Sequence, residues 1–196
     1  MSEEQLQRKV LRISLLGDTT VGKTSLIDAF FNIEFSAHTI ANIGIDKQQK
    51  EMEMKDGRTM KIILWDTAGQ ERFHDLAMNT IRTCQGIVLC FDLSKRKSFE
   101  GIPNWLNQIR TIDDKIPIIL FGNKCDLIDN RVVEEEEAKA LSNKYNLEYL
   151  ETSAKENINV NEGFQKIIDE AYEKSGAAAL GVELDMKKKE KKKGCC

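Results

Sequence analysis

Runs of apolar residues alternate with amphipathic segments along most of this chain. Residues 10–16, 86–92 and 117–122 are apolar almost throughout, a pattern typical of strands that are buried on both faces. Between such runs, as in 161–174, apolar residues recur every three or four positions, which is the spacing of one face of a helix. This alternation predicts an α/β domain with a mostly parallel sheet.

Turn and edge signals refine this prediction. The segment 45–54 alternates poorly and is highly charged, as suits an edge strand, and Lys55-Asp56-Gly57-Arg58 fits a hairpin with a two-residue loop. Ser98 is expected to cap a helix that carries Pro103 in its early turns. The expected strands are Val10–Leu16, Ile45–Met54, Thr59–Trp65, Gly86–Asp92, Pro117–Gly122 and Leu147–Leu150. The expected helices are Ser25–Phe31, Ser98–Thr111, Val133–Lys144 and Asn161–Lys174.

Composition bounds the class of protein. The 196 residues, 41% of them hydrophobic and 31% charged, fit one domain with a tail. The polar, acidic start 1–5 predicts neither a secretory signal nor a transit peptide, and no run of about 18 apolar residues predicts a membrane span. We expect an N-terminal extension at 1–9, a domain at 10–175 and a flexible basic tail at 176–196.

Charge is distributed unevenly. Residues 186–196 contain six lysines and one glutamate and so carry +5, which leaves −8 on the rest of a chain whose net charge is −3. An acidic body argues against nucleic-acid binding, and a basic tail fits contact with an anionic surface. Cys84, Cys90 and Cys125 lie in or beside apolar strands and are expected to be free thiols in a reducing cytosol.

The most specific motif follows the first expected strand. Gly17-Asp18-Thr19-Thr20-Val21-Gly22-Lys23-Thr24 has the G-x-x-x-x-G-K-[ST] spacing of a phosphate loop that opens a helix. Backbone N–H groups and the helix dipole then point at the phosphates, and Gly17 and Gly22 take backbone angles that a Cβ would forbid. Lys23 is expected to reach the β- and γ-phosphates, and the Thr24 hydroxyl to hold Mg²⁺.

Three further motifs follow later strands. Asp66 ends a strand and is placed to accept from Mg²⁺-bound water, while Gly69 offers its N–H to a γ-phosphate and Gln70 orients the attacking water. Asn123-Lys124-Cys125-Asp126 places a carboxylate where it can accept from guanine N1–H and the 2-amino group, and adenine lacks both donors. The Lys124 stem can cover one face of the base.

The last of these motifs is Glu151-Thr152-Ser153-Ala154-Lys155. The backbone N–H of Ala154 suits guanine O6, and Ser153 and Lys155 support the loop. Each of the two base-side motifs alone also fits an ordinary polar surface loop, so their weight comes from their combination with the phosphate loop.

In this order and spacing, the four motifs resemble the Ras superfamily of small GTPases over about residues 9–174. Trp65–Phe73 matches the switch II signature of the Rab branch, Ile43–Asp46 resembles the Rab segment after switch I, and the terminal Gly194-Cys195-Cys196 resembles the double-cysteine Rab ending. The resemblance implies a P-loop G domain, whose six-stranded, mostly parallel sheet has one antiparallel edge strand and helices, five in all, on both faces.

The resemblance also implies bound GTP or GDP, Mg²⁺, and GTP hydrolysis that is slow without a GTPase-activating protein. Gln70 and Lys23 are then the catalytic candidates, and Thr24, Asn42 and Asp66 the metal ligands. The candidate nucleotide contacts are Gly17, Asp18, Thr19, Thr20, Val21, Gly22, Lys23, Thr24, Ser25, Phe35, Asn42, Asp66, Gly69, Asn123, Lys124, Asp126, Ser153, Ala154 and Lys155.

Some positions depart from the family pattern. Asn42 stands where the family has a threonine that coordinates Mg²⁺ in the GTP state, which predicts weaker or altered closure of switch I; Thr39 replaces it only if the loop shifts register. Lys47 replaces a phenylalanine and Thr80-Ile81-Arg82 replaces Tyr-Tyr-Arg, so two aromatics of the Rab effector surface are missing. Thr19 and Thr20 stand where small residues are common, and their bulk is expected to slow hydrolysis.

The tail is expected to anchor the protein. Two adjacent terminal cysteines after a basic run resemble a doubly geranylgeranylated Rab ending, and two lipid chains give a stable anchor where one is marginal. The resemblance implies a vesicle-trafficking switch at the cytoplasmic face of an intracellular membrane that cycles with the cytosol. Its partners are then an exchange factor, a GTPase-activating protein, an escort protein or GDP-dissociation inhibitor, and effectors, with the chain itself a monomer.

Two other functions stay open at the level of sequence. A membrane-tethered scaffold that binds guanine nucleotide and hardly hydrolyses it is motivated by Asn42, Thr19 and Thr20, although Gln70 argues against it. A phosphate-loop ATPase or kinase is disfavoured by Asp126 and Ala154, because these residues suit guanine.

Overall fold

Three strands with continuous apolar runs form the middle of the sheet. In the computed structural model, which describes residues 10–33, 45–67 and 74–176, they are β1 (Val10–Leu16), β4 (Gly86–Asp92) and β5 (Ile118–Asn123). Every residue of β4 and β5 is buried, because helices cover both faces of these strands. The apolar runs therefore mark parallel central strands, as predicted.

The remaining strands flank this centre in the order β2-β3-β1-β4-β5-β6. β2 (Ile45–Glu53) pairs antiparallel with β3 (Thr59–Thr67), and all other neighbours, including β6 (Glu148–Thr152) beside β5, are parallel. The predicted charged edge strand is confirmed, since β2 pairs on one side alone.

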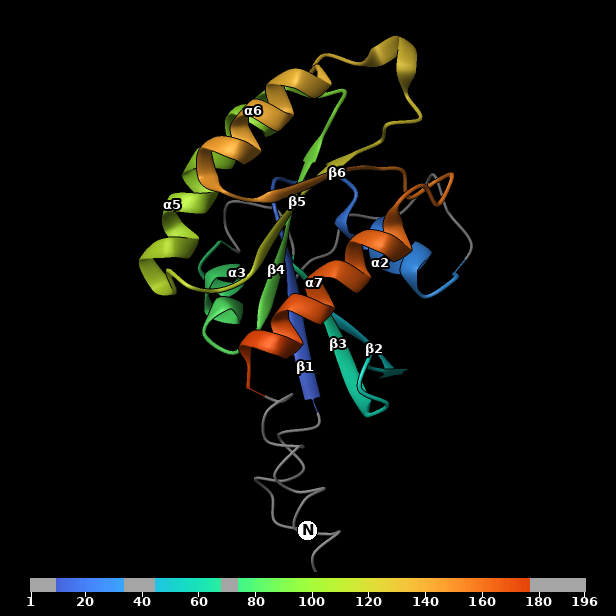
Figure 1. Ribbon diagram of the computed structural model, residues 1–196. Coiled ribbons are helices and arrows are strands. Elements are labelled where there is room, and N and C mark those ends of the chain that lie inside the picture. The colour runs from blue at the N-terminus through green and yellow to red at the C-terminus, as the bar shows by residue number, and fades with distance from the viewer. Residues whose placement is uncertain (1–9, 34–44, 68–73, 177–196) are drawn as a thin grey trace, which may run out of the picture.

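Helices cover the sheet on both faces and enclose two hydrophobic clusters (Figure 1). α2 (Lys23–Phe30) and α7 (Val160–Lys174) pack on one face, where Phe164 lies 4.5 Å from Phe30 and 5.8 Å from Phe121 between ring centroids. The other face is covered by α3 (His74–Ile81), α4 (Arg96–Glu100), α5 (Ile102–Ile112) and α6 (Glu135–Tyr145). A short 3₁₀ helix, η2 (Ile128–Asn130), precedes α6.

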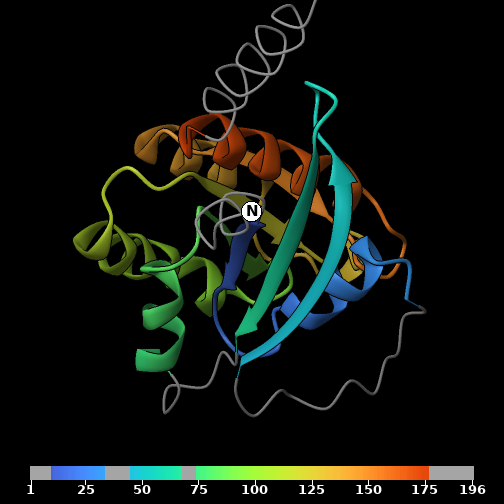
Figure 2. The ribbon, with the colours of Figure 1, turned by 90° about the horizontal axis from the view of Figure 1, so that it is seen from below.

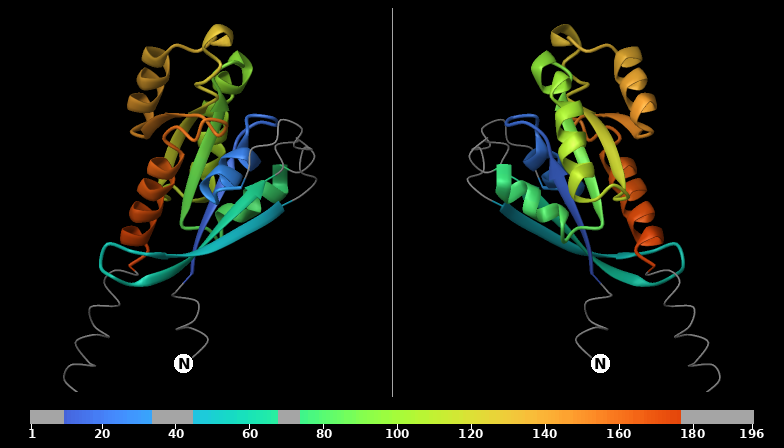
Figure 3. Two further views of the ribbon diagram at one scale, coloured as in Figure 1. Left: turned by 90° about the vertical axis from the view of Figure 1, so that its right-hand side faces the viewer. Right: turned by 90° about the vertical axis from the view of Figure 1, so that its left-hand side faces the viewer.

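The hairpin between β2 and β3 has a longer turn than predicted. The Met54 N–H donates to the Arg58 carbonyl at 2.7 Å, and the Gly57 N–H donates to the Met54 carbonyl at 2.8 Å, so the loop has three residues, 55–57. Its tip lies beside the end of α7, as Figures 2 and 3 show. Lys55 pairs with Asp169 at 2.8 Å, and the Tyr172 hydroxyl donates to Asp56 at 2.7 Å.

The predicted helix 98–111 is wrong, because two helices stand there, separated at Gly101. Ser98 is not a cap: it lies inside α4, where its hydroxyl donates to the Lys95 carbonyl at 2.7 Å and accepts from the Asp92 N–H at 3.0 Å. Pro103 lies in the first turn of α5, where its missing N–H costs nothing. α3 was not predicted, and the other boundaries agree within two residues.

The three domain cysteines are free, as predicted, with Cys90 buried and Cys84 and Cys125 half-buried. Burial raises the pKa of Cys84 and of Cys90 to about 12, so both stay protonated at neutral pH. Within the described ranges, no helix has the length and apolar character that crossing a membrane requires.

Gly163 offers a test of the packing between α7 and the sheet. A Cβ there would lie 2.4 Å from Cζ of Phe121, a rigid ring inside the core. Overpacking against so rigid a ring should cost about 3 kcal/mol, the upper end of the usual range, and alanine gains about 1 kcal/mol of helix propensity. Gly163→Ala should therefore lower the free energy of unfolding by about 2 kcal/mol in urea denaturation. Asn161→Ala, at an exposed position of the same helix, should not lower it. A Gly163→Ala protein as stable as the wild type would contradict this account of the interface.

Candidate functional site

The four sequence motifs meet at one end of the sheet. The phosphate loop follows β1, Asp66 lies near the end of β3, Asn123 ends β5, and Thr152 ends β6. These strands are parallel, so their carboxyl ends share an edge, at the top in Figure 1, where open α/β sheets bind ligands. The four motifs therefore meet at this edge, in so far as the structure describes them.

The phosphate loop requires its two glycines. Gly17 has φ of +136° and Gly22 has φ of +100°, both in the region that side chains disfavour. A Cβ on Gly17 would lie 2.2 Å from the Cys90 carbonyl oxygen, and one on Gly22 would lie 2.3 Å from Nδ2 of Asn123. The loop thus packs closely against β4 and β5. The prediction that Gly17 and Gly22 take backbone angles that a Cβ would forbid is confirmed.

Lys23, the first residue of α2, lies beneath this loop. Its side chain is buried, and its ammonium donates to the carbonyls of Gly17 at 2.9 Å and Asp18 at 2.8 Å. Burial lowers the pKa of Lys23, and the carboxylates of Asp66 and Asp18 oppose this shift. A buried cation held by carbonyl oxygens at the first residue of a helix is well suited to an anionic ligand.

Thr24 and Asp66 form the described part of the candidate metal site. The Thr24 hydroxyl donates to Oδ2 of Asp66 at 2.6 Å, and the end of β3 is fixed because the Thr67 hydroxyl donates to the Leu15 carbonyl at 2.6 Å. Among the described residues, no cluster of three or more His, Cys, Asp and Glu side chains could hold a metal. A hydroxyl and a carboxylate oxygen this close fit Mg²⁺, which takes few protein ligands and keeps several waters.

Asn123 joins the phosphate loop to the two base-side loops. Its Nδ2 donates to the Val21 carbonyl at 2.8 Å, and its Oδ1 accepts from the Thr152 hydroxyl at 3.3 Å. All three groups are buried, so this amide fixes three loops in relation to one another.

Lys124 follows with φ of +69° and makes a second link. Its ammonium pairs with Oδ2 of Asp92 at 2.6 Å and donates to the Thr20 carbonyl at 3.0 Å. The Asp92 side chain is fully buried and its other oxygen accepts from Ser94, so Lys124 supplies the positive charge that such a carboxylate needs.

Asp126 is oriented from the neighbouring loop. The Ser153 hydroxyl donates to Oδ1 of Asp126 at 2.6 Å, and it accepts from the Glu156 N–H at 3.0 Å. Ser153 and Ala154 are buried, whereas Lys155 is exposed and pairs with Glu156. The Ser153 hydroxyl thereby fixes the direction of the Asp126 carboxylate at this edge of the sheet.

Some predicted site residues lie outside the described ranges. These are Phe35, Asn42, Gly69, Gln70, Cys195 and Cys196. Among the described ones, Thr19 and Thr20 are exposed, Val21 is buried, and Ser25 is half-buried in the first turn of α2.

Three residues near the loop were missed by sequence reasoning. Asp92 carried the same signal as Asp66, a carboxylate that ends an apolar strand. Trp105 donates from Nε1 to Oδ1 of Asp18 at 2.9 Å, and Lys95 donates to the Thr20 hydroxyl at 2.6 Å. These two contacts depend on how α4 and α5 pack beside the phosphate loop, and no local sequence pattern predicts that packing.

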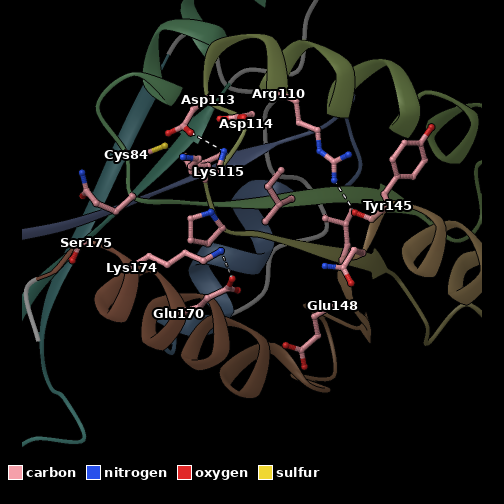
Figure 4. A pocket seen from close by; sticks show the side chains of 16 residues that line it. Cys84, Arg110, Asp113, Asp114, Lys115, Tyr145, Glu148, Glu170, Lys174 and Ser175 are labelled. Carbon is pink, nitrogen blue, oxygen red and sulfur yellow. Dashed lines mark hydrogen bonds and ion pairs between the residues drawn. The ribbon is translucent and has the colours of Figure 1, made fainter.

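A surface hollow of about 820 Å³ lies at the opposite end of the sheet (Figure 4). It is lined by the amino-terminal ends of β5 and β6, by Lys174 at the end of α7 and by Ser175, which follows that helix. Among its charged side chains, Lys174 pairs with Glu170 at 2.8 Å, and Arg110 donates to the Tyr145 carbonyl at 2.7 Å. The hollow is thus separate from the candidate nucleotide site.

Comparison with known proteins agrees with this geometry. The model of the Ras family matches residues 12–173. The chain is 42% identical to the Ras-related protein RGP2 of Oryza sativa subsp. japonica, across 83% of this chain and 75% of that protein. It is 41% identical to the Ras-related protein Rab11A of Lotus japonicus (83% and 72%) and 37% identical to the Ras-related protein Rab-13 of Rattus norvegicus (88% and 85%). The chain belongs to the Ras family, as a Rab-like small GTPase that hydrolyses GTP and acts in vesicle trafficking.

Proposed function

We propose that the residues gathered at the carboxyl ends of the strands form the nucleotide site of a GTP/GDP switch. The observation that carries this proposal is the buried ammonium of Lys23, which lies against the Gly17 and Asp18 carbonyls where α2 begins. From there it reaches a phosphate bound by the loop N–H groups of 17–25. Thr24 and Asp66 hold Mg²⁺, which neutralises phosphate charge when bound.

The base is read by the loops after β5 and β6. The Asp126 carboxylate accepts from guanine N1–H and the 2-amino group, and the Ala154 N–H donates to guanine O6. The Ser153 hydrogen bond, at 2.6 Å, supports this assignment because it fixes the direction of the carboxylate. Asn123 and the Lys124 stem complete the base site, with Phe35 flanking the base and Lys155 supporting the loop.

Hydrolysis is assigned to Gln70, which positions the attacking water, with Asn42 as the Mg²⁺ ligand of the GTP state. Residues 36–46 and 67–82 form the surface that effectors recognise. The second candidate function is a membrane-tethered scaffold that binds guanine nucleotide and hardly hydrolyses it. The exposed Thr19 and Thr20 in the phosphate loop favour it, because each adds side-chain bulk beside the phosphates.

Base selection tests the first assignment. In Asp126→Asn, an amide donor faces guanine donors, so the affinity for GDP should fall by at least about 100-fold, measured by competition against fluorescent GDP. The wild type should reject ATP by about 10⁴-fold. Asp129→Asn, at an exposed position in η2, is the matched control and should bind GDP normally. Unchanged GDP affinity in Asp126→Asn would remove Asp126 from the base site.

Single-turnover hydrolysis separates the switch from the scaffold. With Mg²⁺ and GTP, the wild type should hydrolyse slowly, and Gln70→Leu should lose at least about tenfold in rate because the attacking water is no longer oriented. In a working switch, Asn42→Thr changes the rate little, since the amide oxygen already serves as the ligand. No hydrolysis in the wild type together with recovery in Asn42→Thr would establish the scaffold instead.

We infer that the tail makes the switch membrane-bound. Residues 10–175 form the G domain, 1–9 precede it, and 176–196 form a basic tether that ends in lipidated Cys195 and Cys196. The protein then cycles between an intracellular membrane and the cytosol, with an escort protein or GDP-dissociation inhibitor, an exchange factor and a GTPase-activating protein as partners. The +5 charge of residues 186–196 supports this proposal, because an anionic leaflet attracts lysines.

Replacement of the terminal cysteines tests the anchor. Changing both Cys195 and Cys196 to serine should move the protein from the membrane fraction of eukaryotic cells to the cytosol, because the six lysines of the tail alone give reversible attraction. Binding of GTP should be unchanged. Cys84→Ser, which alters a thiol within the domain, should leave the membrane fraction as it is. Continued membrane recovery of the double variant would refute the lipid anchor.

A further inference from the structure

Thr20 lies in the phosphate loop with a backbone conformation that is unusual for its residue type. Its φ is +64°, in the left-handed region. Among the described residues, six other than glycine have positive φ: four are asparagines, which tolerate this region, and the others are Lys124 and Thr20. Thr20 is the β-branched member of this set, so its backbone needs contacts that hold it there.

Two ammonium groups supply such contacts. Lys95 donates to the Thr20 hydroxyl at 2.6 Å, and Lys124 donates to the Thr20 carbonyl at 3.0 Å. The backbone of Lys95 is itself fixed, because its N–H donates to the Asp92 carbonyl at 2.9 Å and its carbonyl accepts from the buried Ser98 hydroxyl at 2.7 Å. The exposed side chain of Lys95 thus bridges the start of α4 and the loop.

We propose that Lys95 is a positioning residue for the bound nucleotide, which holds the phosphate loop in its binding conformation through the Thr20 hydroxyl and so slows the release of GDP. Thr20 lies two residues before Gly22 and three before Lys23, so a change in its backbone redirects the N–H groups that face the phosphates. The inference rests on the proposed nucleotide site, because it requires the phosphates to be bound by this loop.

The bridge between Lys95 and Thr20 makes the effect depend on both residues. Without the ammonium, Thr20 loses the contact to its hydroxyl and keeps only the Lys124 contact to its carbonyl, so its backbone can leave the left-handed region. Glycine at position 20 would take this conformation without strain and would need no such bridge. Loss of Lys95 should therefore matter when residue 20 is threonine and should not matter when it is glycine.

The experiment measures the dissociation rate of fluorescent GDP from the purified full chain, in Mg²⁺, after addition of excess unlabelled GDP. Lys95→Met keeps the length of the side chain and removes its charge, and Thr20→Val keeps the shape of the threonine and removes its hydroxyl. Each should release GDP about three- to tenfold faster than the wild type, the loss expected for one charge-assisted hydrogen bond at an exposed site. Lys97→Met, at an exposed lysine in the helix that Lys95 precedes, should not change the rate.

Double variants decide whether Lys95 acts through Thr20. Lys95→Met should add nothing to Thr20→Val, and it should have no effect in a Thr20→Gly background. An unchanged rate in Lys95→Met, or an equal acceleration in all three backgrounds, would overturn this inference while the proposed nucleotide site stands. A wild-type chain that retains no fluorescent GDP would overturn both.

Discussion

The pairing of Lys124 with the buried carboxylate of Asp92 is the constraint on which the site depends. A carboxylate with no exposed side-chain surface is costly unless a positive charge and hydrogen bonds compensate for lost water. Lys124 and Ser94 provide both, so the ammonium has one favourable position. From that position it also reaches the Thr20 carbonyl, and one charge therefore sets the distance between the ends of β4 and β5 and the phosphate loop.

Neutral hydrogen bonds extend this arrangement across the sheet. The Asn123 amide joins the phosphate loop to β6, and the Thr67 hydroxyl joins the end of β3 to β1. Each of these polar groups is buried, so breaking one leaves an unsatisfied donor or acceptor. The same hydrogen bonds therefore hold the loops of the site in place and stabilise the fold at the carboxyl ends of the strands. A substitution that breaks one of them should change both the geometry of the site and the stability of the domain.

Sequence patterns predicted the elements whose residues are buried on both faces. They missed features that depend on contacts between residues far apart in the sequence. β4 and β5 are apolar at nearly every position because both faces are covered, so their bounds could be read from the chain. α3 was missed because HDLAMNTI, unlike the equally short α2, does not follow a motif that requires a helix, and the separation of α4 from α5 at Gly101 was hidden within one continuous pattern. In the site, motif spacing predicted the roles of Lys23, Thr24 and Asp126, whereas the approach of Lys95 and Trp105 to the loop follows from tertiary packing.

The position where α7 ends determines from which side of the domain the chain continues. Lys174 and Ser175 line the hollow at the amino-terminal ends of the strands, across the sheet from the phosphate loop, and the β2–β3 hairpin is pinned beside them by Lys55 and Asp56. The described chain therefore ends at the side of the domain opposite the proposed nucleotide site. The proposed anchor would then be attached at the end of the domain opposite the proposed nucleotide site, so the attachment itself would not cover that site.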